Sequence, residues 1–112
     1  MSAELRLRIQ YPQGSIGPGK IALLEQIDVT GSISAGARAL GMSFRRAWLL
    51  VDTMNRCFRS PLVDAATGGK AGGGAALTSL GEEVLARFRR MEAEAAKACA
   101  VDLKALKAKL AK

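Results

Sequence analysis

A glycine-rich segment near the N-terminus carries the residue types of a nucleotide site. The segment GSIGPGK, Gly14 to Lys20, matches the G-x-x-x-x-G-K spacing of a P-loop, whose backbone amides and lysine bind phosphates. It lies between an expected strand and an expected helix, and the run LLVD, which ends at Asp52, resembles a Walker B strand. Ile21, however, stands where Mg²⁺ needs a Ser or Thr hydroxyl, and LLVD lies inside a helical pattern. A chain of 112 residues also lacks the alternating strands and helices of a parallel sheet, so we predict no nucleotide hydrolysis.

A second glycine-rich segment, TGGKAGGGAALT from Thr67 to Thr78, allows three interpretations: a phosphate cradle, a flexible linker or a β-hairpin. Its glycines match neither the P-loop spacing nor G-x-G-x-x-G, and no strand-to-helix junction surrounds them. The strand candidates LVDAAT and AALT flank the glycines and can pair with each other. We therefore predict a hairpin whose glycines let the chain turn and whose tip carries Lys70 outward.

The remaining residue types exclude several kinds of catalytic and metal site. The chain has no histidine, and Cys57 and Cys99 are far apart in the sequence. It therefore lacks a CxxC pair, a Cys/His zinc set and any Cys–His or Ser–His nucleophile arrangement. We interpret both cysteines as buried thiols in a reducing cytoplasm. The protein is predicted to be a binding protein and not an enzyme, with no metal and no cofactor, and no small-molecule site is evident.

The charge balance favours an anionic partner. Lysine and arginine outnumber the acids 17 to 10, which gives a formal charge of +7 and a pI near 10.0. This balance predicts a folded basic protein and favours nucleic acid or an anionic membrane as the partner. No stretch approaches the ~20 apolar residues of a membrane span, and the N-terminus has no signal-peptide core. We therefore expect one cytoplasmic domain that does not cross a membrane.

The hydrophobic spacing predicts a mainly α-helical chain with a small β-hairpin. Ser32 and Ser43 are placed to cap the second and third helices, and Gly41 lies where the second helix should stop. Thr78 or Ser79 opens the last helix, and Ser79 and Glu82 have the spacing of a capping box. The expected elements are a strand over Leu5–Ile9, helices over about Pro18–Val29, Ile33–Leu40 and Phe44–Phe58, strands over Leu62–Thr67 and Ala75–Thr78, and a helix from Ser79.

The last helix has one apolar side. If it continued unbroken from Ser79 to Lys112 it would be about 50 Å long, which a small domain cannot cover by itself. A partner helix is then implied, and the alternative is a break near Val101 and Asp102, with Asp102 capping a separate short helix. The stripe runs through Val84, Phe88, Met91, Ala95 and Cys99, and Leu103, Leu106 and Leu110 continue it. The predicted dimerisation residues are Val84, Leu85, Phe88, Met91 and Ala95.

The order strand, helix, helix, helix, strand, strand, helix is that of a winged helix. In the segment from Ile33 to Asp52, Gly36 and Ala37 lie where two helices must approach closely, and Gly41 permits a sharp turn. The spacing favours a helix-turn-helix over an unrelated helical pair. The expected inward-facing residues are Leu40, Met42, Ala47 and Leu50.

In a helix-turn-helix, the helix that begins after Ser43 enters the DNA major groove. Arg45 and Arg46 then face the DNA, where an arginine either binds guanine with two hydrogen bonds or binds phosphate. A solvated charged face is the alternative, and Phe44 and Trp48 fit either DNA contact or the core. The DNA-binding residues predicted around these helices are Ser32, Ser43, Phe44, Arg45, Arg46 and Arg56, with Arg59 as a weaker backbone contact.

The segment GKIALLEQIDVTGSISAGARALGMSFRRAWLLVDTMN, followed by PLVDAATGGKAGGGAALTSLGEEVLARF, resembles the N-terminal DNA-binding domain of ModE-type molybdate-responsive transcription regulators. This type of DNA-binding domain is related more distantly to the LysR-type winged helices. The resemblance runs from about Arg6 to Met91, and it implies that Thr67 and Lys70 are DNA-binding residues on the wing. It implies a winged helix-turn-helix domain over residues 1–91 and a long dimerisation helix over residues 79–112. It also implies a bacterial homodimer, located at the nucleoid, that binds a palindromic operator near molybdenum-transport or molybdoenzyme genes.

The molybdate-binding domains of that family have no counterpart in this sequence. After about Met91 the chain continues only as an Ala/Lys-rich helix, so no residue is assigned to molybdate. We expect either a natural short form or a DNA-binding fragment of a longer chain. The alternative function is a protein-interaction or dimerisation module on the same scaffold, without specific DNA readout.

Overall fold

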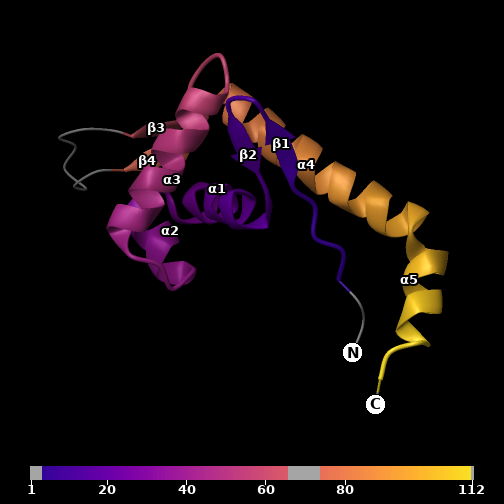
Figure 1. Cartoon of the computed structure of the whole chain (residues 1–112). Helices are drawn as coiled ribbons and strands as arrows, with labels where there is room; N and C mark the ends of the chain where they lie inside the picture. The colour runs from indigo at the N-terminus through magenta and orange to yellow at the C-terminus, as the bar shows by residue number, and fades with distance from the viewer. Residues whose placement is uncertain (1–3, 66–73, 112) are drawn as a thin grey trace.

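The computed structural model describes residues 4–65 and 74–111 and is mainly α-helical, as predicted (Figure 1). Within these residues there are two small antiparallel hairpins where we predicted one, β1 with β2 and β3 with β4. The elements are β1 (Ile9–Tyr11), β2 (Gly14–Ile16), α1 (Pro18–Thr30), α2 (Ile33–Ala39), α3 (Phe44–Cys57), β3 (Val63–Ala65), β4 (Ala75–Leu77), α4 (Ser79–Ala98) and α5 (Ala100–Lys107).

The first hairpin corrects the predicted N-terminal strand. The alternating run Leu5–Ile9 is almost entirely outside the strand, which begins at Ile9 and pairs with β2 so that Ile9 faces Ile16. A turn at Pro12 and Gln13 joins the two strands. Alternation alone does not make a strand, because a strand also needs a neighbouring strand for its backbone hydrogen bonds. The turn at Pro12 and Gln13 brings β2 beside Ile9–Tyr11, so the strand forms there and not over Leu5–Ile9.

Helix α1 is the centre of the core. It begins with Pro18 in its first turn and ends at Gly31, which has φ +75° and donates its N–H to the carbonyl of Ile27 at 2.8 Å. Four apolar residues on its inner side are fully buried: Ile21, Leu23, Leu24 and Ile27. Side chains from β2, α2, α3, β3, β4 and α4 pack around them.

Helices α2 and α3 begin at the predicted caps. The Ser32 hydroxyl accepts the N–H of Ala35 at 3.0 Å, and the Ser43 hydroxyl accepts the N–H of Arg46 at 3.1 Å. Gly41, in the turn between the helices, has φ +68°, which explains the glycine there. These caps and this turn confirm the predicted helix pair.

Close packing of α2 on α1 depends on a small residue. A Cβ atom at Gly36 would lie 3.3 Å from the backbone nitrogen of Ile27, which confirms that two helices approach closely here. Ala37 and Ala47 are fully buried, as expected. Leu40 corrects the prediction: it is 37% exposed, because it follows the last residue of α2 and turns away from the core.

The second hairpin is attached to both α3 and α1. The Asn55 side chain, on α3, accepts the N–H groups of Leu62 at 2.8 Å and Val63 at 3.2 Å and donates to the Val63 carbonyl at 3.3 Å. Ala75, on β4, donates its N–H to the carbonyl of Gly31 at 2.8 Å. The paired strands confirm the predicted hairpin.

Helix α4 begins with a different cap from the predicted capping box. The Thr78 hydroxyl accepts the N–H of Gly81 at 2.9 Å and donates to the Pro61 carbonyl at 2.8 Å, whereas Ser79 is the first helical residue. Gly81 fits so closely against Leu62, the residue before β3, that a Cβ atom there would overlap the carbonyl oxygen of Leu62. The contacts of Thr78 with Pro61 and of Gly81 with Leu62 thus fix where α4 leaves the hairpin.

The C-terminal part of the described chain extends beyond the core. Phe88 is the last buried residue of α4, and α5 has none. We call residues 89–107 the arm and the described residues up to Phe88 the body; Figure 1 shows the arm extending from the body, with α5 at an angle to α4. The radius of gyration is 16.4 Å, compared with about 13 Å for a compact domain of this length.

The arm is not one continuous helix. Cys99, with φ −97° and ψ 5°, separates α4 from α5, and α5 ends at Lys107. The unbroken helix to Lys112 is therefore wrong, and the break lies two residues before the alternative at Val101, with Asp102 inside α5. No helix of the described residues combines the length and apolar character needed to cross a bilayer.

Candidate nucleic-acid interface

Helix α3 has one buried side and one exposed side. Ala47, Val51 and Met54 face the core, at the spacing of three and four residues that a helix requires. Leu50 and Phe58 are partly buried against the same core. The opposite side is exposed along the helix and carries Phe44, Arg45, Arg46, Trp48, Leu49 and Arg56.

The two arginines in the first turn of α3 are exposed, as predicted. Neither Arg45 nor Arg46 forms an ion pair with a carboxylate among residues 4–65 and 74–111. Successive helical residues point about 100° apart, so the two guanidinium groups project from different sides of α3. One helix turn therefore presents two separate positive charges.

The two serines predicted to touch DNA are helix caps in this structure. Ser32 and Ser43 each accept a backbone N–H at the start of their helix. A hydroxyl that accepts one hydrogen bond still has a proton to donate. Both side chains therefore stabilise α2 and α3 and keep a donor for a further partner.

Arg56 is separated from the first-turn arginines. It lies about 16 Å along α3 from Arg45 and forms an exposed ion pair with Asp52 at 2.9 Å. An exposed pair of this kind is weak, so it leaves Arg56 able to exchange Asp52 for another anion. Thr67 and Lys70, predicted in the second hairpin with Lys70 at its tip, lie outside the described residues.

Two further apolar residues lie on the exposed side of α3: Trp48, which the sequence left open between DNA contact and the core, and Leu49, which was not among the predicted DNA contacts. Trp48 and Leu49 are 49% and 47% exposed, and together with Phe44 and Arg45 they line a shallow depression. The residue type of an aromatic side chain does not show whether it lies on the buried or on the exposed side of a helix. The signal in the sequence was the core stripe of α3, since Trp48 lies about 100° around the helix from Ala47.

The predicted dimerisation residues are divided between the core and the surface. Phe88 is 1% exposed and belongs to this chain's own core, so we correct its predicted role as a dimer contact. Val84 and Leu85 are half-buried against that core, and Ala95 is partly exposed. Met91, 42% exposed, has the largest exposed apolar surface of this set.

An apolar groove runs between the first hairpin and α4. Its volume is about 240 Å³, and Met91 lies at its α4 side. Tyr11 and Phe58, which also line it, pack edge to face with ring centroids 6.1 Å apart. Val84 and Met91 therefore form part of an apolar surface that extends from α4 to the first hairpin.

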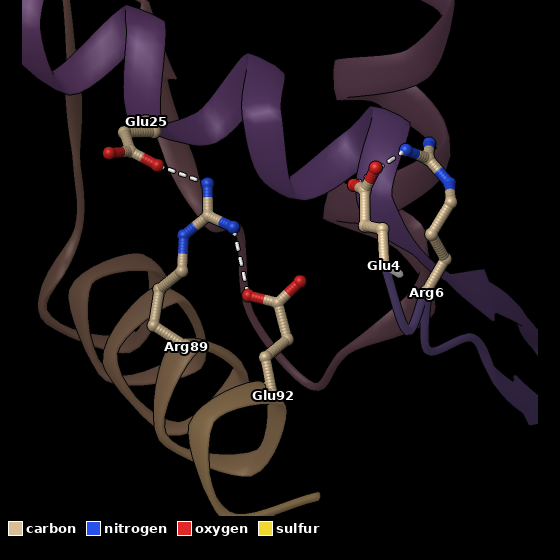
Figure 2. Close-up of polar contacts among 5 residues, drawn as sticks. All are labelled: Glu4, Arg6, Glu25, Arg89 and Glu92. Carbon is tan, nitrogen blue, oxygen red and sulfur yellow. Dashed lines mark hydrogen bonds and ion pairs between the residues drawn. The ribbon is translucent and has the colours of Figure 1, made fainter. Parts of the chain in front are cut away.

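Charged contacts connect α4 to α1 where the arm begins (Figure 2). Arg89 donates to Glu92, one turn further along α4, at 2.8 Å and also pairs with Glu25 on α1. The hydrogen bond that Arg89 donates to Glu92 raises the pKa of Arg89, and the contact with Glu25 acts in the same direction. A second pair in the same view, Glu4 with Arg6 at 3.2 Å, joins neighbours in the N-terminal segment.

The P-loop-like segment is structural. Lys20 donates to the carbonyl of Ser15 at 2.8 Å, and Ile21 is fully buried in the core. The run LLVD lies within α3, as predicted.

Cys57 and Cys99 are free but partly exposed, which corrects the prediction that they are buried. Within residues 4–65 and 74–111 no cluster of acidic and thiol side chains is placed to hold a metal ion.

Three relatives are similar to most of this chain. The molybdenum-pterin-binding protein MopB of Rhodobacter capsulatus is 50% identical over 82 residues, 73% of this chain and 30% of MopB. The transcriptional regulator ModE of Yersinia pestis is 46% identical over 86 residues, 76% of this chain and 33% of that protein. The chain is a homologue of the ModE and Mop proteins. The DNA-binding transcriptional dual regulator ModE of Escherichia coli K12, 42% identical over 86 residues, supports the same relationship.

This homology confirms the resemblance found in the sequence. The chain spans about a third of the length of these relatives. No family model matches it. The names of these relatives are those of regulators and of a binding protein, and none of the three names a catalytic activity.

Proposed function

We propose that this chain is a sequence-specific DNA-binding transcription regulator built on a winged helix-turn-helix. In this proposal α2 and α3 form the helix-turn-helix, and the β3–β4 hairpin is the wing. The observation that carries it is the first turn of α3, which α1 and α2 support from the core side while Arg45 and Arg46 face outward. Homology to proteins named as transcriptional regulators supports the same function.

The chemistry of α3 fits a recognition helix. An α-helix fits the major groove of DNA, and the residues of its first turns reach the base edges. The cap at Ser43 fixes where α3 begins, so it also fixes which side chains occupy that first turn. In the proposed complex Arg45 and Arg46 contact guanine or phosphate, and Arg56 and Lys70 contact the DNA backbone.

We further propose that two chains pair through α4 and the first hairpin. The pairing surface then includes Val84, Leu85, Met91 and Ala95, and it presents two α3 helices about 34 Å apart to successive major grooves. A palindromic operator follows from the twofold symmetry of such a pair. By homology, its target genes are linked to molybdenum transport or molybdoenzymes in a bacterial cytoplasm.

Selection of bound genomic fragments, followed by sequencing, tests this proposal. The expected result is a recurring palindrome, bound with an affinity that falls steeply between 50 and 200 mM salt. Arg45→Ala and Arg46→Ala then show whether each arginine reads bases or binds phosphate. A base contact lowers the ratio of operator to random-DNA affinity, whereas a phosphate contact lowers both affinities equally.

The controls use a charge on α5 and a charge on the wing. Lys104→Ala, on α5, removes an exposed lysine outside α3 and outside the proposed pairing surface, and should leave both affinities within about twofold. Lys70→Ala should weaken binding to all sequences about equally. The absence of salt-sensitive binding to any fragment would overturn the proposal.

A protein-interaction module is the second candidate function, because the groove beside α4 and the exposed side of the arm offer apolar surface. Size-exclusion chromatography distinguishes the two functions: association without DNA binding favours the interaction module. Molybdate added to the DNA-binding assay is expected to have no effect. A molybdate-dependent change in affinity would show that this chain senses the oxyanion.

A further inference from the structure

We infer that Phe44, Trp48 and Leu49 form an apolar base-reading surface on α3 that recognises the methyl groups of thymines beside a base contacted by Arg45. This inference rests on the proposed function and specifies it, because it names the operator chemistry that α3 selects. It assigns Trp48 and Leu49 a role as specificity-determining residues.

The three apolar side chains lie together on the exposed side of α3. Phe44 and Trp48 are four residues apart and therefore lie one above the other on successive turns. They are 54% and 49% exposed, and Leu49 is 47% exposed. With Arg45 they line one shallow depression. Three large apolar residues exposed on consecutive turns of one helix are a typical signature of a binding surface.

The core of the body does not need these side chains. Ala47, Val51 and Met54 already provide the buried side of α3 and are at most 5% exposed. Arg45 borders the depression, and Arg46 projects from the same turn. A partner for this surface therefore has to present an apolar group to Trp48 and an anionic or hydrogen-bond-accepting group to Arg45 and Arg46.

The major groove of double-stranded DNA meets both requirements. The C5-methyl group of thymine is the apolar feature of the groove floor, and the phosphates along its edges match the exposed arginines. Arg45 lies within the apolar depression and is placed to reach a base edge, whereas Arg46 points about 100° away, toward the groove wall. The expected half-site therefore combines thymines with a guanine.

Replacing thymine by deoxyuridine tests this inference, because it removes only the methyl group and leaves base pairing intact. The probe is the selected operator with deoxyuridine at every thymine of one half-site, titrated with the full chain. Loss of each buried methyl should weaken binding about fourfold. Deoxyuridine outside the half-sites should leave the affinity unchanged.

Trp48→Ala connects the methyl effect to the side chain. For this variant the ratio of thymine to deoxyuridine affinity should fall toward one, and Leu49→Ala gives a second test if Trp48→Ala unfolds by circular dichroism. Arg46→Ala should weaken both DNAs and keep the ratio. The matched control is Val29→Ala, an exposed apolar residue at the end of α1 that should change neither affinity.

Three results would overturn the inference. Equal binding of thymine and deoxyuridine operators by the unmodified chain would exclude methyl recognition. An unchanged affinity ratio in both folded variants would place the methyl contact elsewhere, and a changed oligomeric state with that ratio intact would identify a protein interface. Failure of the proposed function itself is separate, because no operator would then be bound at any salt concentration.

Discussion

The body and the arm differ in whether their apolar side chains are buried within the chain. Every fully buried hydrophobic side chain of the described residues lies at or before Phe88, whereas in the arm Val101 is 81% and Leu106 is 65% exposed. Burial of apolar side chains provides most of the stability of a small domain, and short isolated helices are marginal in water. The body therefore has the contacts of an independent folding unit, and the arm has the surface of an element that pairs with something else.

The largest expected effect concerns the last core residue before the arm. Phe88→Ala should lower the free energy of unfolding by about 3–5 kcal/mol, because it removes a fully buried aromatic ring and leaves a cavity. Leu106→Ala, its counterpart in the arm, should change that free energy by less than about 0.5 kcal/mol. Urea unfolding followed by circular dichroism at the lowest measurable concentration compares them. Equal losses would mean that body and arm fold as one unit.

A smaller loss is expected where α4 packs against Leu62, just before β3. Gly81→Ala places a Cβ atom against the carbonyl oxygen of Leu62, and should destabilise the body by about 1–3 kcal/mol. Gly19, in α1, has nothing within 4 Å of the corresponding position, so Gly19→Ala should stabilise the chain by up to about 1 kcal/mol. Thermal unfolding of both variants measures the difference. A tolerated alanine at position 81 would contradict this packing of α4.

The cap of α4 is expected to contribute less again. Thr78→Ala removes a hydroxyl that caps the helix and bonds to Pro61, and should cost about 1–2 kcal/mol. Ser79→Ala should cost less than about 0.5 kcal/mol, because Ser79 is already inside the helix. Urea midpoints of the two variants distinguish the observed cap from the capping box predicted from sequence. The reverse ranking would restore the capping box.

The smallest effect is expected at the charged contact that joins the arm to α1. A double-mutant cycle of Glu25→Gln and Arg89→Gln should give a coupling of about 0.2–1 kcal/mol that decreases with added salt. The raised pKa of Arg89 means that this stabilisation is present at neutral pH and is lost only as pH rises through that pKa, far into the alkaline range. Arg87 and Glu83, paired within α4, provide the control cycle. A coupling that is independent of salt would show a contact of a different kind.

The elements that sequence predicted well depend on local chemistry. Ser32 and Ser43 cap the helices that follow them, and Gly41 turns the chain between those helices, each through contacts within four residues. The failures depend on distant partners. The first strand was misplaced because pairing with β2 decides its position, and Phe88 was assigned to a dimer because an apolar stripe does not say what covers it.

The candidate site shows the same division. The exposure of Arg45 and Arg46 followed from charge and helical spacing, which are properties of α3 alone. The exposure of Trp48 depends on how completely other residues fill the core, and no property of the tryptophan itself reveals that. The break between α4 and α5 was expected only as an alternative near Val101, and its position at Cys99 could not be predicted because neither glycine nor proline stands there.

The three hydrogen bonds of Asn55 have a consequence for the proposed DNA complex. They attach the start of the second hairpin to α3, and the hydrogen bond between Ala75 and Gly31 attaches its other strand to the end of α1. Recognition helix and hairpin base are thereby preorganised in one orientation before any DNA arrives. The loss of conformational entropy then falls on folding and not on binding, which favours affinity without any additional contact.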